Sequence, residues 1–288
     1  MIICHNFINA SFIDIDIVTV MSDPYGEAMD YGMEVDFPEN DNPKVRRYLW
    51  DDEADAADLI IHNVDETTRI KDRVKAISLY AEKVKGECPI AGWVEGAVAE
   101  YCDLKDISSA MVDFAMEEDF LDDVLEKITQ QAIVYIKAQV EAGADIIGVG
   151  DAACSLLGPR IYARYGFPYE KKLVDAIHEC GALAKLHICG NIQPLLPKIA
   201  ELGVDIVDID WMVDFGYAAE TLKGISAVNG NFDPAAVMLS GTPEIIHDAV
   251  LHCLSVGGDH CLISAGCEVP RDTPLENLRA VAETLRSC

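Results

Sequence analysis

Short apolar runs alternate with longer amphipathic runs along most of the 288-residue chain. Each short run is apolar on both faces of an extended chain and is followed by polar or glycine residues, a pattern typical of parallel strands buried on both sides. We expect seven such strands: Asp16–Met21, Ile90–Val94, Asp145–Val149, Ala184–Ile188, Val204–Ile209, Ser226–Asn229 and His260–Ala265. An eighth strand is expected from either Ile2–Asn6 or Met33–Phe37.

The amphipathic runs predict helices between the strands. Apolar residues recur at helical spacing from Leu121 to Val140, and Gly143 stands where a C-terminal cap belongs. Thr273 comes before a proline at the first position of another predicted helix, and Glu276 would complete a capping box with this threonine. Regular alternation of strands and helices predicts right-handed βαβ units around a parallel sheet.

We therefore predict an α/β fold in the form of a single (β/α)8 TIM-type barrel. Such barrels reach about 250 residues as one domain, so residues 1–288 are expected to form one domain. The stretch 39–72 is first acidic and then amphipathic, and we expect it to be a partly irregular excursion from the barrel.

The formal net charge is −28, from 22 basic and 50 acidic residues. Nucleic acids and anionic membrane surfaces are polyanions and would be repelled, so neither is an expected partner. Ten cysteines are present, yet the first twenty residues lack the basic start of a signal peptide. Reduced thiols in the cytoplasm are therefore expected, and no apolar run approaches the roughly 18 residues of a membrane span.

Polar or ionisable side chains follow every predicted strand. They are Asp23, Glu95, Asp151, His187 with Cys189, Asp210, Asn231 with Asp233, and Cys267 with Glu268. The carboxyl ends of barrel strands converge on one face, which is where active sites of this architecture lie. Taken singly, each residue could equally be a cap of the helix that follows it.

His187 and Cys189 are the most specific of these residues. Positions i and i+2 of a strand point the same way, so the imidazole and the thiol share a face. Cys267, at the end of another strand, would add a second thiolate. Two thiolates and a neutral imidazole suit Zn²⁺ with an open fourth position, as catalytic zinc requires. By contrast, His178 and Cys180 lie on a predicted helix, where residues two apart do not face each other.

Several motifs resemble the uroporphyrinogen decarboxylase superfamily, whose fold is an (α/β)8 barrel. They are Met21-Ser22-Asp23-Pro24, Gly32-Met33-Glu34-Val35, Leu157-Gly158-Pro159 and Gly230-Asn231-Phe232-Asp233-Pro234. The resemblance extends from about residue 15 to the end of the chain. True decarboxylases of the superfamily use no metal and carry an N-terminal Arg-Gln-Ala-Gly-Arg segment, which this sequence lacks.

The second branch of the superfamily binds zinc through a His-x-Cys pair and a downstream cysteine, and this sequence resembles that branch in the same residues. This branch contains the corrinoid-dependent methyltransferases of the methylcobamide:coenzyme M type. The resemblance implies a zinc ion held by His187, Cys189 and Cys267, and methyl transfer between a corrinoid and a small thiol or similar acceptor. We also expect the usual N-terminal helical extension to be short or missing.

The strand-end positions and the matched motifs predict further roles around the zinc. Asp23, Glu95 and Asp151 are expected to be catalytic, with Glu95 and Asp151 as alternative proton acceptors or resting zinc ligands. Asn231, Asp233 and Asp210 are expected to bind substrate. The cobalt-ligating motif Asp-x-His-x-x-Gly is absent from the sequence, so the corrinoid would be supplied by a partner protein.

Two other functions compete with this one. The first is decarboxylation of a tetrapyrrole, as in a uroporphyrinogen decarboxylase, because Asp23 matches the aspartate that binds the pyrrole nitrogens in that enzyme. The acidic strand ends are unfavourable for such a polycarboxylate substrate. The second is a non-catalytic binding protein on a degenerate barrel.

Overall fold

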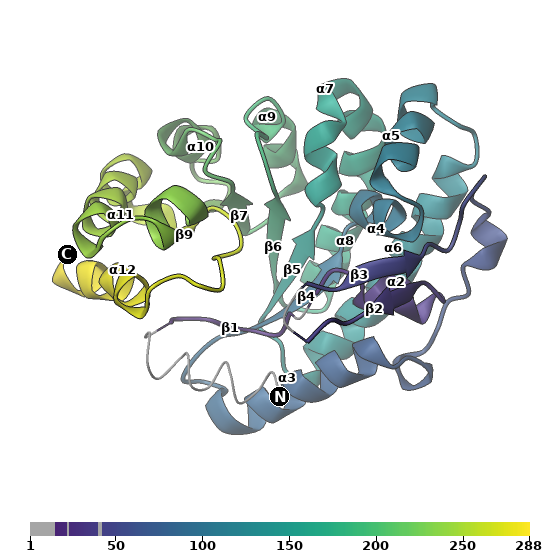
Figure 1. Cartoon of the computed structure of the whole chain (residues 1–288), viewed down its shortest axis with the longest axis horizontal. Helices are drawn as coiled ribbons and strands as arrows, with labels where there is room; N and C mark the ends of the chain where they lie inside the picture. The colour runs from purple at the N-terminus through teal and green to yellow at the C-terminus, as the bar shows by residue number, and fades with distance from the viewer. Residues whose placement is uncertain (1–14, 22, 40–41) are drawn as a thin grey trace. The chain divides into compact units, whose positions relative to one another are not determined.

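A computed structural model of the chain describes residues 15–21, 23–39 and 42–288. Its contacts group into two compact units. The N-terminal unit is Thr19–Ala184, and the C-terminal unit is Lys185–Cys288 together with the residues up to Val18. Both units are built from strands and helices that alternate along the chain (Figure 1). Within the described ranges, no helix combines the length and apolarity needed to cross a membrane.

The strands of the N-terminal unit are β4 (Ile90–Glu95) and β5 (Ile146–Gly150), and β1 (Val18–Thr19) lies at its boundary. β4 and β5 are parallel, and every residue in both is buried. The backbone N–H of Val20, just after β1, donates to the carbonyl of Ala91 at 2.8 Å, so this segment lies beside β4. Burial on both faces explains why these strands read as nearly continuous apolar runs.

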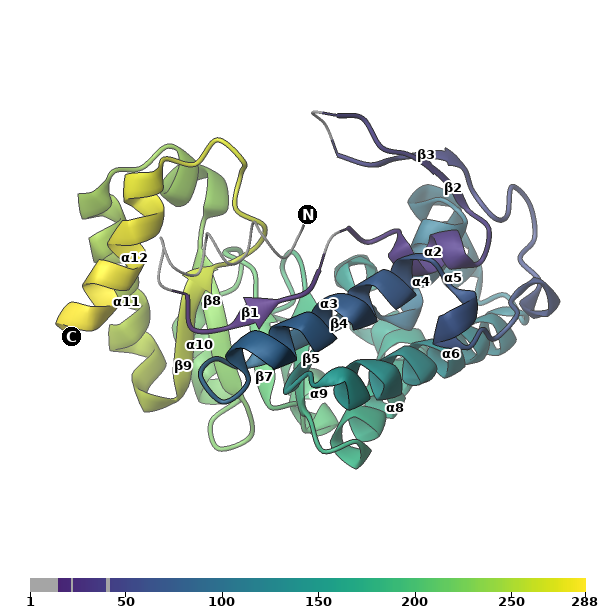
Figure 2. The ribbon, with the colours of Figure 1, turned by 90° about the horizontal axis from the view of Figure 1, so that it is seen from below.

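Helices cover the strands of the N-terminal unit. They are α2 (Gly26–Asp30), α3 (Arg69–Val84), α4 (Ala97–Leu104), α5 (Ile107–Met116), α6 (Leu121–Ala142), α7 (Gly158–Ile161) and α8 (Phe167–Glu179), with the short turns η3 (Ala152–Leu156) and η4 (Tyr162–Gly166). Among them α6 is central, because it packs against α3, α4, α8 and β4 (Figures 1 and 2). As predicted, α6 ends just before Gly143, whose φ of +116° suits glycine.

Two buried glutamines connect α6 to its surroundings. The Gln139 side chain accepts from the backbone N–H of Trp93 at 2.9 Å and donates to the Trp93 carbonyl at 3.0 Å. Gln131 makes the same pair of bonds to the backbone of His62, at 2.6 and 3.0 Å. Each amide therefore satisfies one backbone donor and one backbone acceptor away from water, as buried polar groups require.

The described part of the C-terminal unit contains four parallel strands and four helices. The strands are β6 (Leu183–Ile188), β7 (Ile206–Ile209), β8 (Ala227–Phe232) and β9 (Cys261–Ala265), and the helices are α9 (Leu196–Ile199), α10 (Phe215–Thr221), α11 (Pro243–Gly257) and α12 (Leu275–Ser287), with the turns η5 (Ala200–Leu202), η6 (Pro234–Leu239) and η7 (Gly258–His260). α11 packs against β8, β9 and α12 (Figure 1).

All seven strands predicted from the apolar runs are present, but the eighth is not where we expected it. Ile2–Asn6 lies outside the described residues. Met33–Phe37 contains β2 (Glu34–Asp36), which pairs in an antiparallel hairpin with β3 (Lys44–Arg47) and belongs to a separate two-stranded sheet. The prediction that this segment could be a barrel strand is therefore wrong. Its alternate residues are charged, and Glu34 pairs with Arg46 and Arg47 at the surface.

The stretch 39–72 and the start of α12 are two further segments for which the sequence made a specific prediction. The stretch 39–72 carries β3 and the single turns η1 (Ala56–Asp58) and η2 (Val64–Glu66) among its described residues. The prediction of a capping box at Thr273 is wrong, because α12 begins at Leu275 and its N-cap residue is Pro274. The Thr273 hydroxyl is buried without a hydrogen-bond partner among the described residues.

Replacing Gln139 with leucine should lower the free energy of unfolding by about 2–4 kcal/mol, because it leaves the backbone N–H and C=O of Trp93 unpaired in the core. Gln130→Leu, at an exposed position of the same helix, should change it by less than about 0.5 kcal/mol. Urea unfolding followed by circular dichroism measures both values. Equal stability of the two variants would contradict the role assigned to Gln139.

Candidate metal centre

Three side chains with metal-binding atoms converge in the C-terminal unit. His187 lies near the end of β6, Cys189 follows that strand, and Cys267 follows β9. His187 Nε2 is 2.9 Å from Cys189 Sγ, which is 3.4 Å from Cys267 Sγ. All three donor atoms lie within 4.8 Å of one another, and all three residues are half-buried. The structure thus brings together the three residues that the sequence singled out as metal ligands.

Close approach of two loops makes this arrangement possible. Gly266 lies directly before Cys267, and a side chain there would come within 2.4 Å of the backbone nitrogen of Trp211. The backbone N–H of Gly190, directly after Cys189, donates to Asp210 Oδ2 at 2.7 Å. The segment after β7 therefore holds the residues next to both cysteines.

The electrostatics of the cluster favour an ionised thiol. Hydrogen bonding with Cys189, and next with His187, lowers the pKa of Cys267 to about 4, although partial burial acts in the opposite direction. A thiolate is the form of cysteine that binds metals. The group can therefore offer an anionic sulfur at neutral pH.

The donor set and its spacing fit a zinc ion. Bonds of about 2.3 Å to sulfur and about 2.0 Å to nitrogen place the tetrahedral ligand atoms roughly 3.5–3.8 Å apart, so small side-chain adjustments suffice. Three protein donors leave one position of a tetrahedral ion for water or substrate. The partial exposure of all three side chains is consistent with access to that position.

A second set of polar side chains lies behind His187, and the sequence analysis missed it. Asp208 Oδ2 accepts from Lys185 Nζ at 2.7 Å and lies 3.7 Å from His187 Nδ1. Asp208 Oδ1 accepts from the side-chain amide of Asn229. These residues lie inside β6, β7 and β8, within runs that we interpreted as apolar on both faces. Polar residues at every second position, as in Lys185, His187 and Cys189, were the signal that could have identified them.

The residues expected to bind substrate differ in their surroundings. Asp210 is buried, and its Oδ1 has no hydrogen-bond partner among the described residues. Asn231 donates to the carbonyls of Asp210 and Val213 at 3.1 and 2.6 Å. Asp233 accepts from two backbone N–H groups at the start of η6, which is a capping role. Of these three side chains, Asp210 therefore has an oxygen available for further chemistry.

The residues expected to be catalytic all belong to the N-terminal unit. Asp23 is paired with Arg69 and accepts from the backbone N–H of Tyr25 at 3.2 Å. Glu95 accepts from the indole N–H of Trp93 at 2.9 Å, and burial raises its pKa well above the usual range. Asp151 accepts from the backbone N–H of Ala99 at 2.7 Å, and burial raises its pKa to about 7.

Asp151 has two buried neighbours that the sequence analysis did not connect with it. Its carboxylate, the Cys154 thiol and the Glu170 carboxylate place their donor atoms within 4.8 Å of one another. Burial, followed by the charge of Asp151, raises the pKa of Glu170 to about 8. The hydroxyl of Tyr162 donates to Glu170 at 2.5 Å. In this environment Glu170 holds a proton at neutral pH.

This proton couples stability to pH. The pKa of Glu170 is raised from 4.5 to about 8, so folding takes up a proton wherever the pH lies between these values. The free energy of unfolding should therefore fall as the pH rises from about 5 to about 8. Glu170→Gln should reduce this fall by on the order of 2 kcal/mol in urea unfolding.

A matched control is Glu244→Gln, because Glu244 is exposed and its pKa is lowered by a hydrogen bond from Thr242. That substitution should leave the slope between pH 5 and 8 as in the unmodified protein. An unchanged slope in Glu170→Gln would show that Glu170 is not the group that holds the proton.

Comparison with known proteins gives a consistent result. A family model described as uroporphyrinogen decarboxylase (URO-D) matches residues 9–288. The methylcobamide:CoM methyltransferase MtbA of Methanosarcina mazei is 32% identical over 226 residues, which cover 77% of this chain and 65% of that protein. MtaA of Methanosarcina barkeri, also a methylcobamide:CoM methyltransferase, is 30% identical over 266 residues, which cover 89% of this chain and 74% of that protein.

Decarboxylases are also among the relatives. The uroporphyrinogen decarboxylase of Prochlorococcus marinus is 29% identical over 212 residues, covering 70% of this chain and 60% of that protein. The chain spans 65% and 62% of the length of the MtbA proteins of Methanosarcina mazei and Methanosarcina acetivorans.

Solved structures show the same fold. A methyltransferase from Methanosarcina mazei superposes with a TM-score of 0.90 at 23% identity, covering 99% of this chain and 84% of that one. A B12-independent methionine synthase from Shewanella sp. W3-18-1 superposes with a TM-score of 0.67 at 13% identity, covering 99% of this chain and 86% of that one. The predicted α/β fold of the TIM-barrel type is thereby confirmed. With a family model that matches nearly its whole length, the chain belongs to the uroporphyrinogen decarboxylase (URO-D) family.

Proposed function

We propose that this protein is a zinc-dependent methyltransferase that moves a methyl group between a corrinoid and a small thiol or similar acceptor. The observation that carries the proposal is the convergence of His187, Cys189 and Cys267 in one half-buried cluster. The names of the MtbA and MtaA relatives support the same reaction class. The corrinoid would arrive on a partner protein.

The three residues would hold the metal through one nitrogen and two sulfur atoms. Zinc at this position supplies the positive charge that lowers the pKa of an incoming thiol, which has a pKa of about 8.5 in water. His187 contributes a neutral ligand, and the two thiolates balance the charge of the ion. Holding the acceptor sulfur in one place also removes much of the entropic cost of meeting the methyl donor.

The transfer itself forms one bond and breaks another. The acceptor sulfur forms a bond to the methyl carbon, while the cobalt–carbon bond breaks and its electron pair stays on cobalt, so Co(III) becomes Co(I). The thiol proton needs an acceptor. In the C-terminal unit, Asp210 offers a buried carboxylate oxygen without a hydrogen-bond partner among the described residues.

Glu95 and Asp151 remain the alternative acceptors proposed for the N-terminal unit. A pKa of about 7 makes Asp151 the better matched of these two near neutral pH, since proton transfer is efficient when the acceptor's pKa is close to the working pH. The raised pKa of Glu95 favours its protonated form, which can donate a proton rather than accept one. We propose Asp23 as a further catalytic residue, and Asn231, Asp233 and Asp210 as residues that bind substrate.

A reducing compartment such as the cytoplasm suits these thiols. The nine cysteines of the described residues, including Cys189 and Cys267, form no disulfide with one another. Oxidation of the two ligand sulfurs would remove their capacity to bind the metal.

Purified protein should contain one zinc ion per chain at the three-residue site. Cys267→Ala should lower the zinc content sharply, because two donors bind the ion much more weakly than three. Cys180→Ala is the control, since Cys180 is the C-cap residue of α8 and is not one of the three clustered donors. Plasma emission spectrometry after gel filtration measures both contents. Equal zinc loss in the two variants would refute the ligand assignment.

Methylcobalamin should be demethylated when a small thiol such as coenzyme M is added, and the absorption change from methylcobalamin to cob(I)alamin reports the reaction. Chelation should abolish this activity without changing the far-ultraviolet circular dichroism, because a site with three protein ligands is catalytic rather than structural. A protein that unfolds on chelation would show that the metal is part of the core.

The same preparation should not convert uroporphyrinogen to coproporphyrinogen, because four substrate carboxylates need several cationic partners when buried. Arg160 and Arg164, which follow β5, instead pair with Glu117 and Asp122 at the surface. Coproporphyrinogen formation with methylcobalamin unchanged would establish the decarboxylase function in place of the methyltransferase.

A further inference from the structure

Asp208 occupies a central place behind the proposed zinc ligands. It lies on β7 directly opposite His187 of β6 and opposite Asn229 of β8, since the three residues are paired in the register of neighbouring parallel strands. This alignment is set by the backbone of the sheet. The carboxylate is therefore held next to the imidazole by the fold itself.

Hydrogen bonds fix the carboxylate of Asp208 from two directions. Lys185 Nζ donates to Oδ2 at 2.7 Å, and the side-chain amide of Asn229 donates to Oδ1. The side chains of Lys185, Asp208 and His187 are 22%, 16% and 15% exposed, so solvent screens their interactions only partly. Oδ2 also lies 3.7 Å from His187 Nδ1, and a small movement would bring these atoms into hydrogen-bond range.

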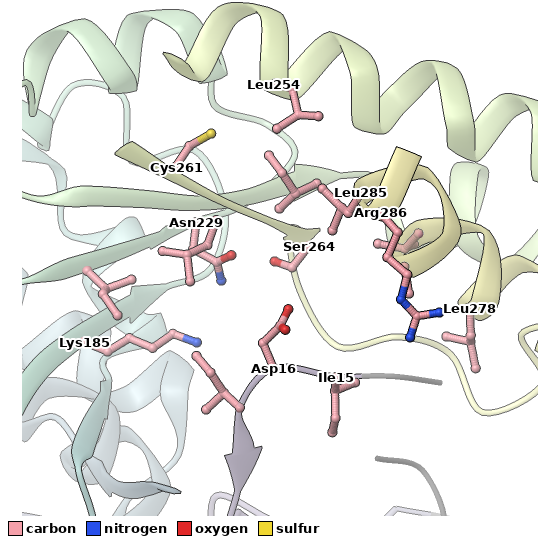
Figure 3. A pocket seen from close by; sticks show the side chains of 16 residues that line it. Ile15, Asp16, Lys185, Asn229, Leu254, Cys261, Ser264, Leu278, Leu285 and Arg286 are labelled. Atoms are coloured by element: carbon pink, nitrogen blue, oxygen red, sulfur yellow. The ribbon is translucent and has the colours of Figure 1, made fainter. Parts of the chain in front are cut away.

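Lys185 and Asn229 line a cavity of about 720 Å³ in the C-terminal unit, which is otherwise lined mainly by apolar residues of β9, α11 and α12. Figure 3 shows the ammonium of Lys185, the amide of Asn229 and the carboxylate of Asp16 pointing toward the same part of this cavity. Burial of a polar group costs free energy unless the group is hydrogen-bonded, which favours the bonds of Lys185 and Asn229 to Asp208.

We propose that Asp208 is a positioning residue that fixes the orientation and tautomer of His187. A histidine that binds a metal through one ring nitrogen carries its proton on the other. Here Nε2 faces Cys189, and Nδ1 faces Asp208. The carboxylate selects the tautomer with a proton on Nδ1, and Lys185 and Asn229 keep the carboxylate in place. This inference rests on the proposed zinc site.

The test measures zinc affinity by competition with a chromophoric chelator, with the metal-free full-length protein as starting material. Asp208→Asn should weaken zinc binding about 10- to 100-fold, as expected when the partner of a metal-binding histidine is removed. Asp214→Asn is the matched control in the same unit, because Asp214 is an exposed N-cap residue of α10 and asparagine caps equally well. Its zinc affinity should equal that of the unmodified protein.

A double-mutant cycle separates positioning from a general structural role. In the His187→Ala background, Asp208→Asn should cause no further loss of zinc affinity, because no imidazole remains to be oriented. A loss of the same size in both backgrounds would overturn the inference, and so would unchanged affinity in Asp208→Asn alone. Asn229→Ala, which removes one support of Asp208, should cause a smaller loss of several-fold and provides the test if Asp208→Asn does not fold.

The outcomes distinguish this inference from the proposed function. An unmodified protein that binds no zinc refutes the proposed function together with the positioning role. An unmodified protein that binds zinc tightly, with Asp208→Asn binding equally tightly, refutes the positioning role alone. Methyl-transfer activity is not needed for either measurement.

Discussion

The two-residue repeat of side-chain direction along parallel strands is the constraint on which the proposed site depends. It places His187 and Cys189 on one side of β6, and the register of the sheet then places Asp208 and Asn229 beside the histidine. A shift of one residue in this register would turn the imidazole away from both the sulfur of Cys267 and the carboxylate behind it. The packing of α11 against β8 and β9 therefore supports the ligands indirectly.

The strands were predictable because burial on both faces leaves a strong local signal. The triad could also be proposed, since His187 and Cys189 are neighbours on one strand and the motifs resembled those of a known family. Asp208 was missed because the two charged residues inside Val204–Ile209 were treated as part of an apolar run. Its role depends on Lys185 and Asn229, which come from two other strands, and sequence spacing does not reveal such pairings.

The incorrect predictions share a physical cause. Met33–Phe37 was considered as a barrel strand, but its charged alternate residues pair with arginines in a surface hairpin. Thr273 was assigned a capping role from its local motif, yet Pro274 adopts an extended conformation and becomes the N-cap itself. In both segments the local pattern was compatible with two structures, and at Met33–Phe37 the pairing with β3 decided between them.

Protonation also changes the electrostatic argument based on the acidic strand ends. Counting all of their carboxylates as charged overstates the negative potential. Burial shifts the pKa of Asp151 to about 7 and that of Glu95 far upward, and Asp23 is paired with Arg69. With a pKa of about 7, Asp151 can exchange a proton near neutral pH, which a fully dissociated carboxylate at the surface cannot do. This property favours the proposed reaction, in which a thiol proton must be accepted.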